Sequence, residues 1–470
     1  MILEKEQNSF AKRNLIVLLM ILLIQVLFAM SPSHQQKIEP VLLWPVAIAL
    51  LLFAIYYFRH TGGLPKGMLP ALCMVAWMYA TRALNGDPYL QLDLHFMLAV
   101  LLGFGVFYLA FQLFRGASLS RCFGFFAKIV VCLLTVISCV ALFCTFTSTV
   151  IKSPFAELEL SALIGRLYLF SMHPNEVACT LSIGLFLAVY VILDSKHLWA
   201  KLLWMLSALC LWLCVATTVT RTVMITISAG MGMLAFLLTF EALRKRRMLL
   251  KVAVSTFSLL CAAVLCFGLF NVATNNLFTA PMMAAPQAQT AMPQAQAEQQ
   301  QPSVQPQEEQ AEIVKQPLLE QRNLMEDMST FTGRKEIWQA GLQAIKERPK
   351  TLLIGMTDAQ VARVPIKYTG REVYHMHNAW METLLLVGIP GLLLYFCFML
   401  RIGLCSVKLF FKQKAPISQR ALAIIPAILM VNGLMEIYPS YSGKMMDLLF
   451  FLVAGAVVAM ANAKNQEITK

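Results

Sequence analysis

The chain has 470 residues, of which 59% are hydrophobic and only 13% are charged, and its mean hydropathy is +0.67. A water-soluble protein carries roughly twice that share of charged residues, so the composition excludes a soluble domain large enough to hold an enzyme by itself. The net charge of +13 is explained by membrane orientation and by anionic lipid, and it requires no nucleic-acid partner.

Apolar stretches close to 20 residues long recur along the whole chain. About 20 helical residues are needed to cross the hydrocarbon core of a bilayer. The apolar stretches therefore predict an all-α polytopic membrane protein with about 12 transmembrane helices. The first stretch follows basic residues but lacks the cleavage site of a signal peptide, so we expect it to be retained. The expected spans are residues 14–30, 41–58, 68–84, 93–114, 125–147, 175–193, 201–219, 222–240, 252–273, 379–400, 421–438 and 446–462.

The distribution of Lys and Arg predicts the orientation of these spans. If the N-terminus is cytoplasmic, most of the basic residues fall in cytoplasmic segments, among them the run "RKRR" at 244–247 and the cluster from Arg401 to Arg420. The positive-inside rule therefore favours an N-in/C-in arrangement. It divides the chain into helices 1–9 (1–273), a large extracytoplasmic loop (274–378) and helices 10–12 (379–470).

The twelve cysteines predict neither a metal site nor a disulfide framework. All of them fall in expected spans or cytoplasmic segments, and they form no CxxC pair or Cys/His cluster. We interpret them as small packing residues.

Two polar groups lie at the expected outer ends of spans in the first half of the chain. The stretch "GRLYLFSMHPNEVACT" places Arg166 and Asn175 on the outer approach to the sixth span. The stretch "ATTVTRTVMITISAG" places Arg221 at the apex of a hairpin with almost no loop. An arginine inside an apolar run usually faces protein or a cavity. Helix capping in the first case, and an arginine that extends to the headgroups in the second, remain alternatives.

The large outer loop has two halves of different character. Residues 281–320 are rich in Gln, Ala and Pro and contain no glycine, aromatic residue or cysteine. They bury too little apolar area to offset the entropy of ordering, so we expect a disordered tether or insertion. Residues 329–348 show helical spacing of apolar residues and end at Arg348-Pro349. This second half predicts an amphipathic helix on the membrane-proximal surface, with Arg334 in its first turn.

The loop ends in "YHMHNAWMETLLLVGIPGLLLYF", where His375, His377 and Asn378 precede an apolar helix that is interrupted by Gly388 to Gly391. The N-terminus of such a helix attracts anions. A cap at His377 or Asn378, and a simple kink or close helix contact at the glycines, are alternative interpretations.

These residues together suggest one chemistry. Guanidinium forks suit the oxygens of a pyrophosphate, and Arg221 and Arg334 would supply two of them. A neutral imidazole at His377 would deprotonate an attacking hydroxyl. The residues therefore predict transfer of a group whose leaving group is a lipid-linked pyrophosphate. The outer segments contain no P-loop or DxD-type metal motif, so we expect no metal and no cofactor.

The motifs resemble those of the O-antigen ligase family and the related bacterial polysaccharide polymerases. His377-Asn378, nine residues and then Gly388-Ile389-Pro390-Gly391 fit that family's pattern of His, then Asn, Ser or Gln, nine residues and Gly-x-x-Gly. The stretches "TVTRT", "TGRKEIW" and "MHPNEVA" resemble three further family elements. The chain departs from the family in having Thr before Arg221 where Ser is usual, and in its Gln/Pro-rich tract.

The resemblance implies a metal-independent, inverting glycosyltransferase of the C-type membrane class in the bacterial cytoplasmic membrane, with its active site facing outward. The donor would be a glycan on undecaprenyl pyrophosphate, and the acceptor a glycan or a lipid-linked molecule such as lipopolysaccharide core. His377, Arg221 and Arg334 would be catalytic. Substrate-binding residues would be His375, Asn378, Arg166, Asn175, Gly388 and Gly391.

Three other functions remain open at this point. A polysaccharide polymerase would use the same residues with a second lipid-linked glycan as acceptor. A transporter or flippase of lipid-linked glycan would place polar groups near the bilayer midplane and often shows two similar halves, neither of which is evident here. A non-catalytic assembly protein is the remaining alternative.

Overall fold

The computed structural model describes residues 68–85, 103–111, 114, 119–147, 151–152, 159–163, 166–168, 173–274, 333–370, 373, 375–439 and 445–463. The expected spans 14–30 and 41–58, the tract 281–320 and most of the span 93–114 lie outside these residues. Residues 103–111 of that last span are helical.

Seven helices in the described part of the chain are long and apolar enough to cross a membrane. They are α5 (Leu119–Thr147), α6 (Pro174–Asp194), α7 (Leu198–Thr217), α8 (Arg221–Ala242), α9 (Met248–Val272), α15 (Ala379–Phe410) and α18 (Met445–Asn462). The protein is therefore a multi-pass, largely α-helical membrane protein, as its composition predicted. The total of twelve spans and the N-in/C-in orientation stay predictions.

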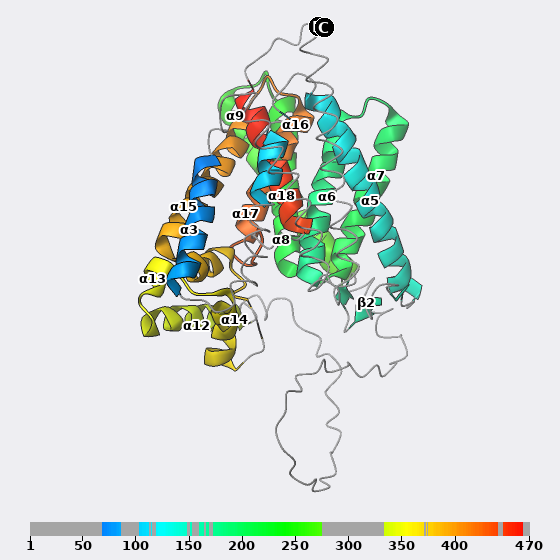
Figure 1. Cartoon of the computed structure of the whole chain (residues 1–470). Coiled ribbons are helices and arrows are strands. Elements are labelled where there is room, and N and C mark those ends of the chain that lie inside the picture. Colours follow the sequence, from blue (N-terminus) through cyan, green and yellow to red (C-terminus); the bar gives the residue numbers. More distant parts are fainter. Residues whose placement is uncertain are drawn as a thin grey trace, which may run out of the picture.

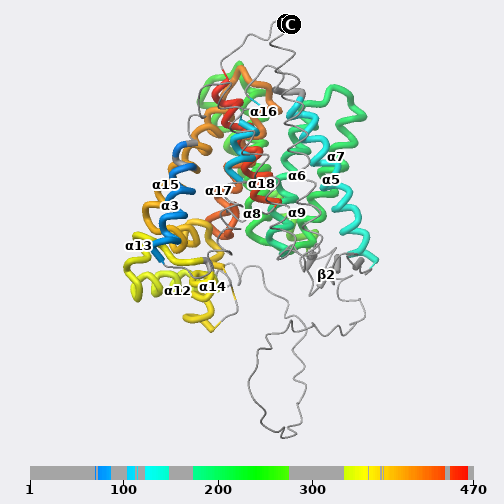
Figure 2. The backbone as a smooth tube through the Cα atoms, in the orientation of Figure 1, coloured from blue at the N-terminus to red at the C-terminus, as the bar shows by residue number. Residues whose placement is uncertain are grey.

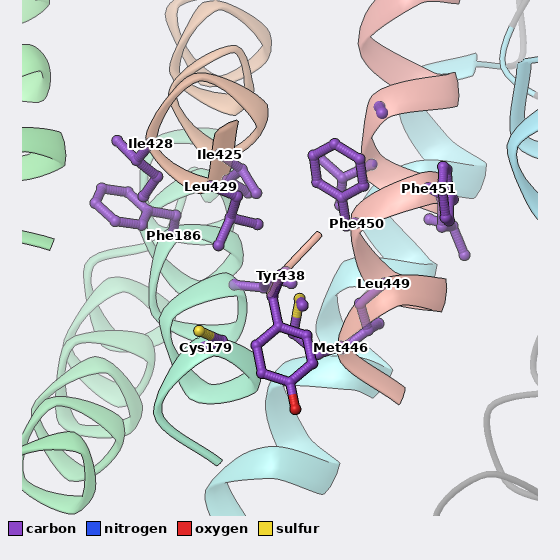
Figure 3. Packing of buried hydrophobic residues seen from close by; sticks show 14 of the residues in the cluster. Cys179, Phe186, Ile425, Ile428, Leu429, Tyr438, Met446, Leu449, Phe450 and Phe451 are labelled. Carbon is purple, nitrogen blue, oxygen red and sulfur yellow. The ribbon is translucent and has the colours of Figure 1, made fainter. Parts of the chain in front are cut away.

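Two of these helices form the centre of the bundle. In an 18-residue apolar stretch of each helix, 94% is buried in α18 and 89% in α6, whereas only 11% is buried in α9. Figure 1 shows α6 and α18 between α3 (Met68–Asn85) and α15 on one side and α5 and α7 on the other. Figure 3 shows side chains of α6, α17 (Ile424–Asn432) and α18 meeting around Tyr438. A helix that is buried all round needs apolar residues on every face, which explains the uninterrupted "LLFFLVAGAVVAMA" of α18.

A small sheet interrupts the helices between α5 and α6. Strands β1 (Ile151–Lys152), β2 (Glu159–Leu163) and β3 (Arg166–Tyr168) pair antiparallel in the order β1-β2-β3. α6 then begins at Pro174, where the missing N–H of proline costs nothing.

Three short helices lie in the second half of the segment 274–378, together at one end of the molecule (Figure 2). They are α12 (Arg334–Glu347), α13 (Thr351–Ile354) and α14 (Asp358–Thr369). α12 ends at the predicted Arg348-Pro349 stop. The apolar face of α12 includes Ile337 and Gly341, and Gly341 lies against the sulfur atoms of Met376 and Met381. This face packs on the start of α15, and the position of α12 on the membrane-proximal surface stays a prediction.

The expected span 421–438 differs most from the structure. It contains two short helices, α16 (Ile417–Leu422) and α17, and α17 ends at Asn432. Gly433 follows, and a Cβ there would meet the carbonyl oxygen of Tyr438 at 3.1 Å. The chain therefore turns back on itself at Gly433, so residues 433–439 form a non-helical segment inside the bundle. Hydrophobicity alone did not reveal this break, because the segment remains mostly apolar.

An ion pair fastens the opposite end of the bundle. Arg420 is 1% exposed, and its Nη1 lies 2.7 Å from Oε2 of Glu241 on α8, while its Nε donates to the carbonyl of Phe410. α8, α15 and α16 are thus joined far from α12, which fixes the helices that carry the candidate site.

Candidate functional site

The buried carboxylate of Glu436 joins three segments of the chain. Nη2 of Arg334 lies 2.6 Å from Oε1 of Glu436, and Nδ1 of His377 lies 3.3 Å from Oε2. Nδ2 of Asn175 also donates to Oε1, at 3.0 Å. The structure thus brings together three residues that the sequence singled out, around a fourth that it did not.

The Glu436 side chain is buried more deeply than those of Arg334 and His377. The Glu436 side chain is 2% exposed, while those of Arg334 and His377 are 17% and 28% exposed. A buried carboxylate is costly unless cations or hydrogen bonds neutralise it. The carboxylate is therefore enclosed, whereas the guanidinium and the imidazole are partly exposed.

The backbone at His377 is held in a strained conformation. Its φ is +48°, in the left-handed region that side chains other than glycine seldom adopt. The neighbouring Met376 is fully buried, its N–H donates to Glu382, and its carbonyl accepts from Nε1 of Trp338 on α12. Strain of this kind persists only where the surroundings enforce it, and it clusters at functional sites.

Asn378 completes this arrangement as the N-cap of α15. Its Oδ1 accepts from the backbone N–H groups of Trp380 and Met381, and its Nδ2 donates to the carbonyl of Leu434. The capping interpretation of Asn378 thus describes its contacts. His375 is more exposed, and its Nδ1 lies 3.5 Å from Oε1 of Glu382.

Thr220, the residue before Arg221, contacts the same group of side chains. α7 ends at Thr217 and α8 begins at Arg221, so the hairpin is as short as expected. Thr220 donates to Oδ1 of Asn175, the residue that also donates to Glu436. Two hydrogen bonds therefore link the first residue before α8 to the Glu436 carboxylate. Arg166 is the first residue of β3, and its side chain is not among the described ones.

The Gly-Ile-Pro-Gly break in α15 receives the backbone of α13. Gly388 has φ +66°, and a Cβ there would lie 2.6 Å from the carbonyl oxygen of Leu353. Gly355 has φ +68°, and a Cβ on it would overlap the carbonyl oxygen of Leu386. Met356 donates its N–H to Leu385. Two glycines thus let two backbones meet, which is the close approach that the sequence left as an alternative.

α3 packs against the other side of the same break. Nε1 of Trp77 donates to the carbonyl of Val387, at 2.8 Å. Beside this contact lies an open, apolar groove of about 600 Å³ between α3 and α15, lined by Cys73, Ala76, Trp77, Pro390, Leu393, Leu394 and Cys397. The groove runs along the helix whose first turn follows His377.

An ion pair joins α12 to α14 on the surface. Nζ of Lys367 and the hydroxyl of Tyr368 both lie 2.6 Å from Oε2 of Glu347. The hydrogen bond from Lys367 lowers the pKa of Glu347, and the same bond raises the pKa of Lys367 to about 12. The contribution of the pair is present at neutral pH and is lost as the pH falls through the lowered pKa of Glu347. Because the pair is exposed, it adds little to stability.

The site combines fixed positive charge with one titratable base. The guanidinium of Arg334 offers a planar fork to phosphate or carboxylate oxygens. No group of three or more His, Cys, Asp or Glu side chains is placed to hold a metal ion within the described ranges.

Sequence reasoning did not find Glu436. The signal was available, because "LMEIYPS" places a carboxylate inside an otherwise apolar run, and an ionisable residue in such a run is a candidate functional residue by default.

One comparison with known proteins bears on this geometry. Residues 206–396 match the family model described as O-Antigen ligase, a stretch that runs from α7 to the middle of α15 and contains Arg221, Arg334 and His377. No curated protein matches the chain. The family resemblance predicted from the sequence is confirmed over residues 206–396, and this stretch is similar to the O-antigen ligase family of ligase- and polymerase-type membrane enzymes.

Proposed function

We propose that this protein transfers a glycan from undecaprenyl pyrophosphate to an acceptor hydroxyl at the outer face of the bacterial cytoplasmic membrane. The observation that carries the proposal is the convergence of Arg334 and His377 on the buried carboxylate of Glu436. These residues come from α12, the turn before α15 and the segment after α17. A cation and a base held on one rigid support suit a reaction in which a hydroxyl displaces an anionic leaving group.

In the proposed mechanism, Glu436 orients the base. With a proton on Nδ1, the His377 ring donates to Oε2 and leaves Nε2 free to take the proton of the acceptor hydroxyl. The hydroxyl oxygen then attacks the anomeric carbon of the donor sugar, on the face opposite the leaving group. The bond from that carbon to the pyrophosphate oxygen breaks, and the configuration inverts.

Arg334 and Arg221 would neutralise the charge that develops on the leaving pyrophosphate. A guanidinium that is already held in place at the moment of reaction stabilises such charge without reorganisation. Arg334 is held by Glu436, and Arg221 begins the helix that follows Thr220. This mechanism requires neither a metal nor a cofactor.

The apolar groove between α3 and α15 suits the polyprenyl tail of the donor. It lies beside Pro390, on the same helix as the proposed base, and its lining is almost wholly apolar. The tail would remain in the lipid phase while the pyrophosphate reaches the outer end of α15. Asn378, Asn175, His375, Arg166, Gly388 and Gly391 stay predicted substrate-binding residues, and the contacts of Asn378 and Asn175 favour a role in positioning Glu436 and His377.

A His377→Ala variant tests the proposal. The variant is expected to insert into the membrane normally and to leave the glycan on its lipid carrier, with turnover lower by roughly 100-fold or more. The measurement is the ratio of lipid-linked to transferred glycan in membranes that contain equal amounts of protein. Unchanged transfer by a correctly inserted variant would exclude this mechanism and would favour the transporter alternative.

Ligase and polymerase activities differ only in the acceptor. Mass spectrometry of the surface glycan in a deletion strain separates them. Intact chains that stay on the lipid carrier indicate a ligase, whereas short glycans that are still attached to their final acceptor indicate a polymerase.

A further inference from the structure

Two cysteines on different helices lie in contact outside the proposed catalytic site. Sγ of Cys139 on α5 is 3.4 Å from Sγ of Cys210 on α7. Both are free thiols in helices that are long and apolar enough to cross a membrane; Cys139 is exposed on the outside of the bundle, the side that would face lipid, and Cys210 is half-buried. A disulfide requires a sulfur–sulfur distance of about 2.05 Å, so the two atoms need to approach by a little more than 1 Å.

The position of the pair makes it more than a packing contact. α5 and α7 both end on the side of the molecule where α6 begins, and each cysteine lies about two helical turns before the end of its helix. α6, which carries Asn175, packs against both helices, and α7 leads directly into the hairpin before Arg221. A covalent link here would fasten α7 to α5 just before that hairpin.

We propose that Cys139 and Cys210 form a redox-active thiol pair, which a disulfide-bearing oxidant converts into an intramolecular disulfide that links α5 to α7. The thiolate of Cys139, the more exposed residue, attacks one sulfur of the oxidant and releases one thiol. The thiolate of Cys210 then attacks the Cys139 sulfur of the mixed disulfide and releases the second thiol. Two protons and two electrons leave the protein, and one oxidant disulfide becomes two thiols.

The experiment uses the full-length protein in its membranes with 4,4′-dipyridyl disulfide as the oxidant. After treatment, free thiols are blocked with N-ethylmaleimide, and the digested protein is analysed by mass spectrometry. We expect a peptide pair linked through Cys139 and Cys210, the loss of maleimide label from both positions, and recovery of both labels after reduction.

Matched variants make the outcome specific. Cys210→Ser and Cys139→Ser should each abolish the linked peptide pair. Cys132→Ser, which removes another exposed thiol of α5, should retain it. Size-exclusion elution identifies a variant that does not fold, and the other single variant then serves in its place. The proposal is overturned if the folded wild-type protein carries only separate pyridyl or maleimide adducts at these two positions. This inference does not depend on the glycan-transfer proposal.

Discussion

At the scale of single residues, Glu436 and the strained backbone of His377 belong together. A left-handed φ at a residue other than glycine costs on the order of 1 kcal/mol or more. Contacts from Trp338, Glu382 and the segment around Leu434 and Glu436 offset that cost. The backbone N–H of Ala379, for example, lies within hydrogen-bond distance of the carbonyls of both Gly433 and Glu436. The imidazole is therefore fixed from the side of its backbone and from the side of its Nδ1.

Replacing Glu436 with Gln is expected to lower turnover about 10- to 100-fold, because the amide keeps the volume but no longer orients His377 or neutralises Arg334 as a carboxylate does. The measurement is the rate of glycan transfer at saturating acceptor. Glu336→Gln is the matched control, because Glu336 lies on the exposed face of α12 and should tolerate the change. Equal rates for the two variants would remove Glu436 from the mechanism.

The sequence identified the residues that carry recognisable motifs and missed the one that connects them. Arg334 begins a helix and His377 lies just before one, and both stand in sequence patterns that can be recognised locally. Glu436 has no local pattern, because its role depends on a chain reversal at Gly433 that brings it back into the bundle. A contact between residues more than 50 positions apart leaves no trace in hydrophobic periodicity.

At the scale of elements, the break in α15 at Gly388 allows the backbone of α13 to pack closely against it. A Gly388→Ala substitution is expected to lower the free energy of unfolding by about 1–3 kcal/mol, because a Cβ at φ +66° would meet the backbone of Leu353. The measurement is the thermal midpoint of the purified protein. Gly268→Ala on α9 is the control, since a Cβ there meets nothing within 4 Å. A midpoint shift of the same size in both variants would contradict the assignment.

A Pro390→Leu substitution tests whether the groove between α3 and α15 binds the polyprenyl tail. The larger side chain would extend into the space between α3 and α15, so we expect weaker use of the lipid-linked donor, seen as a higher KM, with insertion and thermal midpoint nearly unchanged. The contrast with Gly388→Ala separates lipid binding from packing. A donor KM equal to that of the wild-type protein would exclude the groove as the site of the polyprenyl tail.

Most of the long apolar helices begin and end within four residues of the expected bounds, but α5 begins six residues earlier and α15 ends ten residues later than expected. α6 and α8 begin within a residue of their expected starts, because Pro174 and the polar residues around Arg221 punctuate an apolar run. α13 and α14 were not predicted, since four residues of α13 cannot show a period. The contact between Gly355 and the backbone of Leu386 depends on the tertiary fold.

At the scale of the whole molecule, the candidate site draws on segments from both sides of the Gln/Pro/Ala-rich tract. Asn175 and Thr220 precede it, and Arg334, His377 and Glu436 follow it. Deletion of residues 281–320 is therefore expected to leave turnover within about twofold of the wild-type rate, because the contacts described for Glu436 join residues that lie before and after that tract. The assay is glycan transfer by the shortened chain, with scrambling of the tract as a control. Loss of transfer on deletion but not on scrambling would show that its length is required.

The shared carboxylate has a consequence for timing. In the resting protein, Glu436 divides its two oxygens between a guanidinium and an imidazole. Under the proposed roles, a diphosphate competes for Arg334, and as it draws that cation away, the ring becomes the main recipient of the negative charge. Binding of the lipid-linked donor would thus make His377 a stronger base. An acceptor hydroxyl or a water molecule that arrives before the donor would not be activated, so hydrolysis of the donor would be limited.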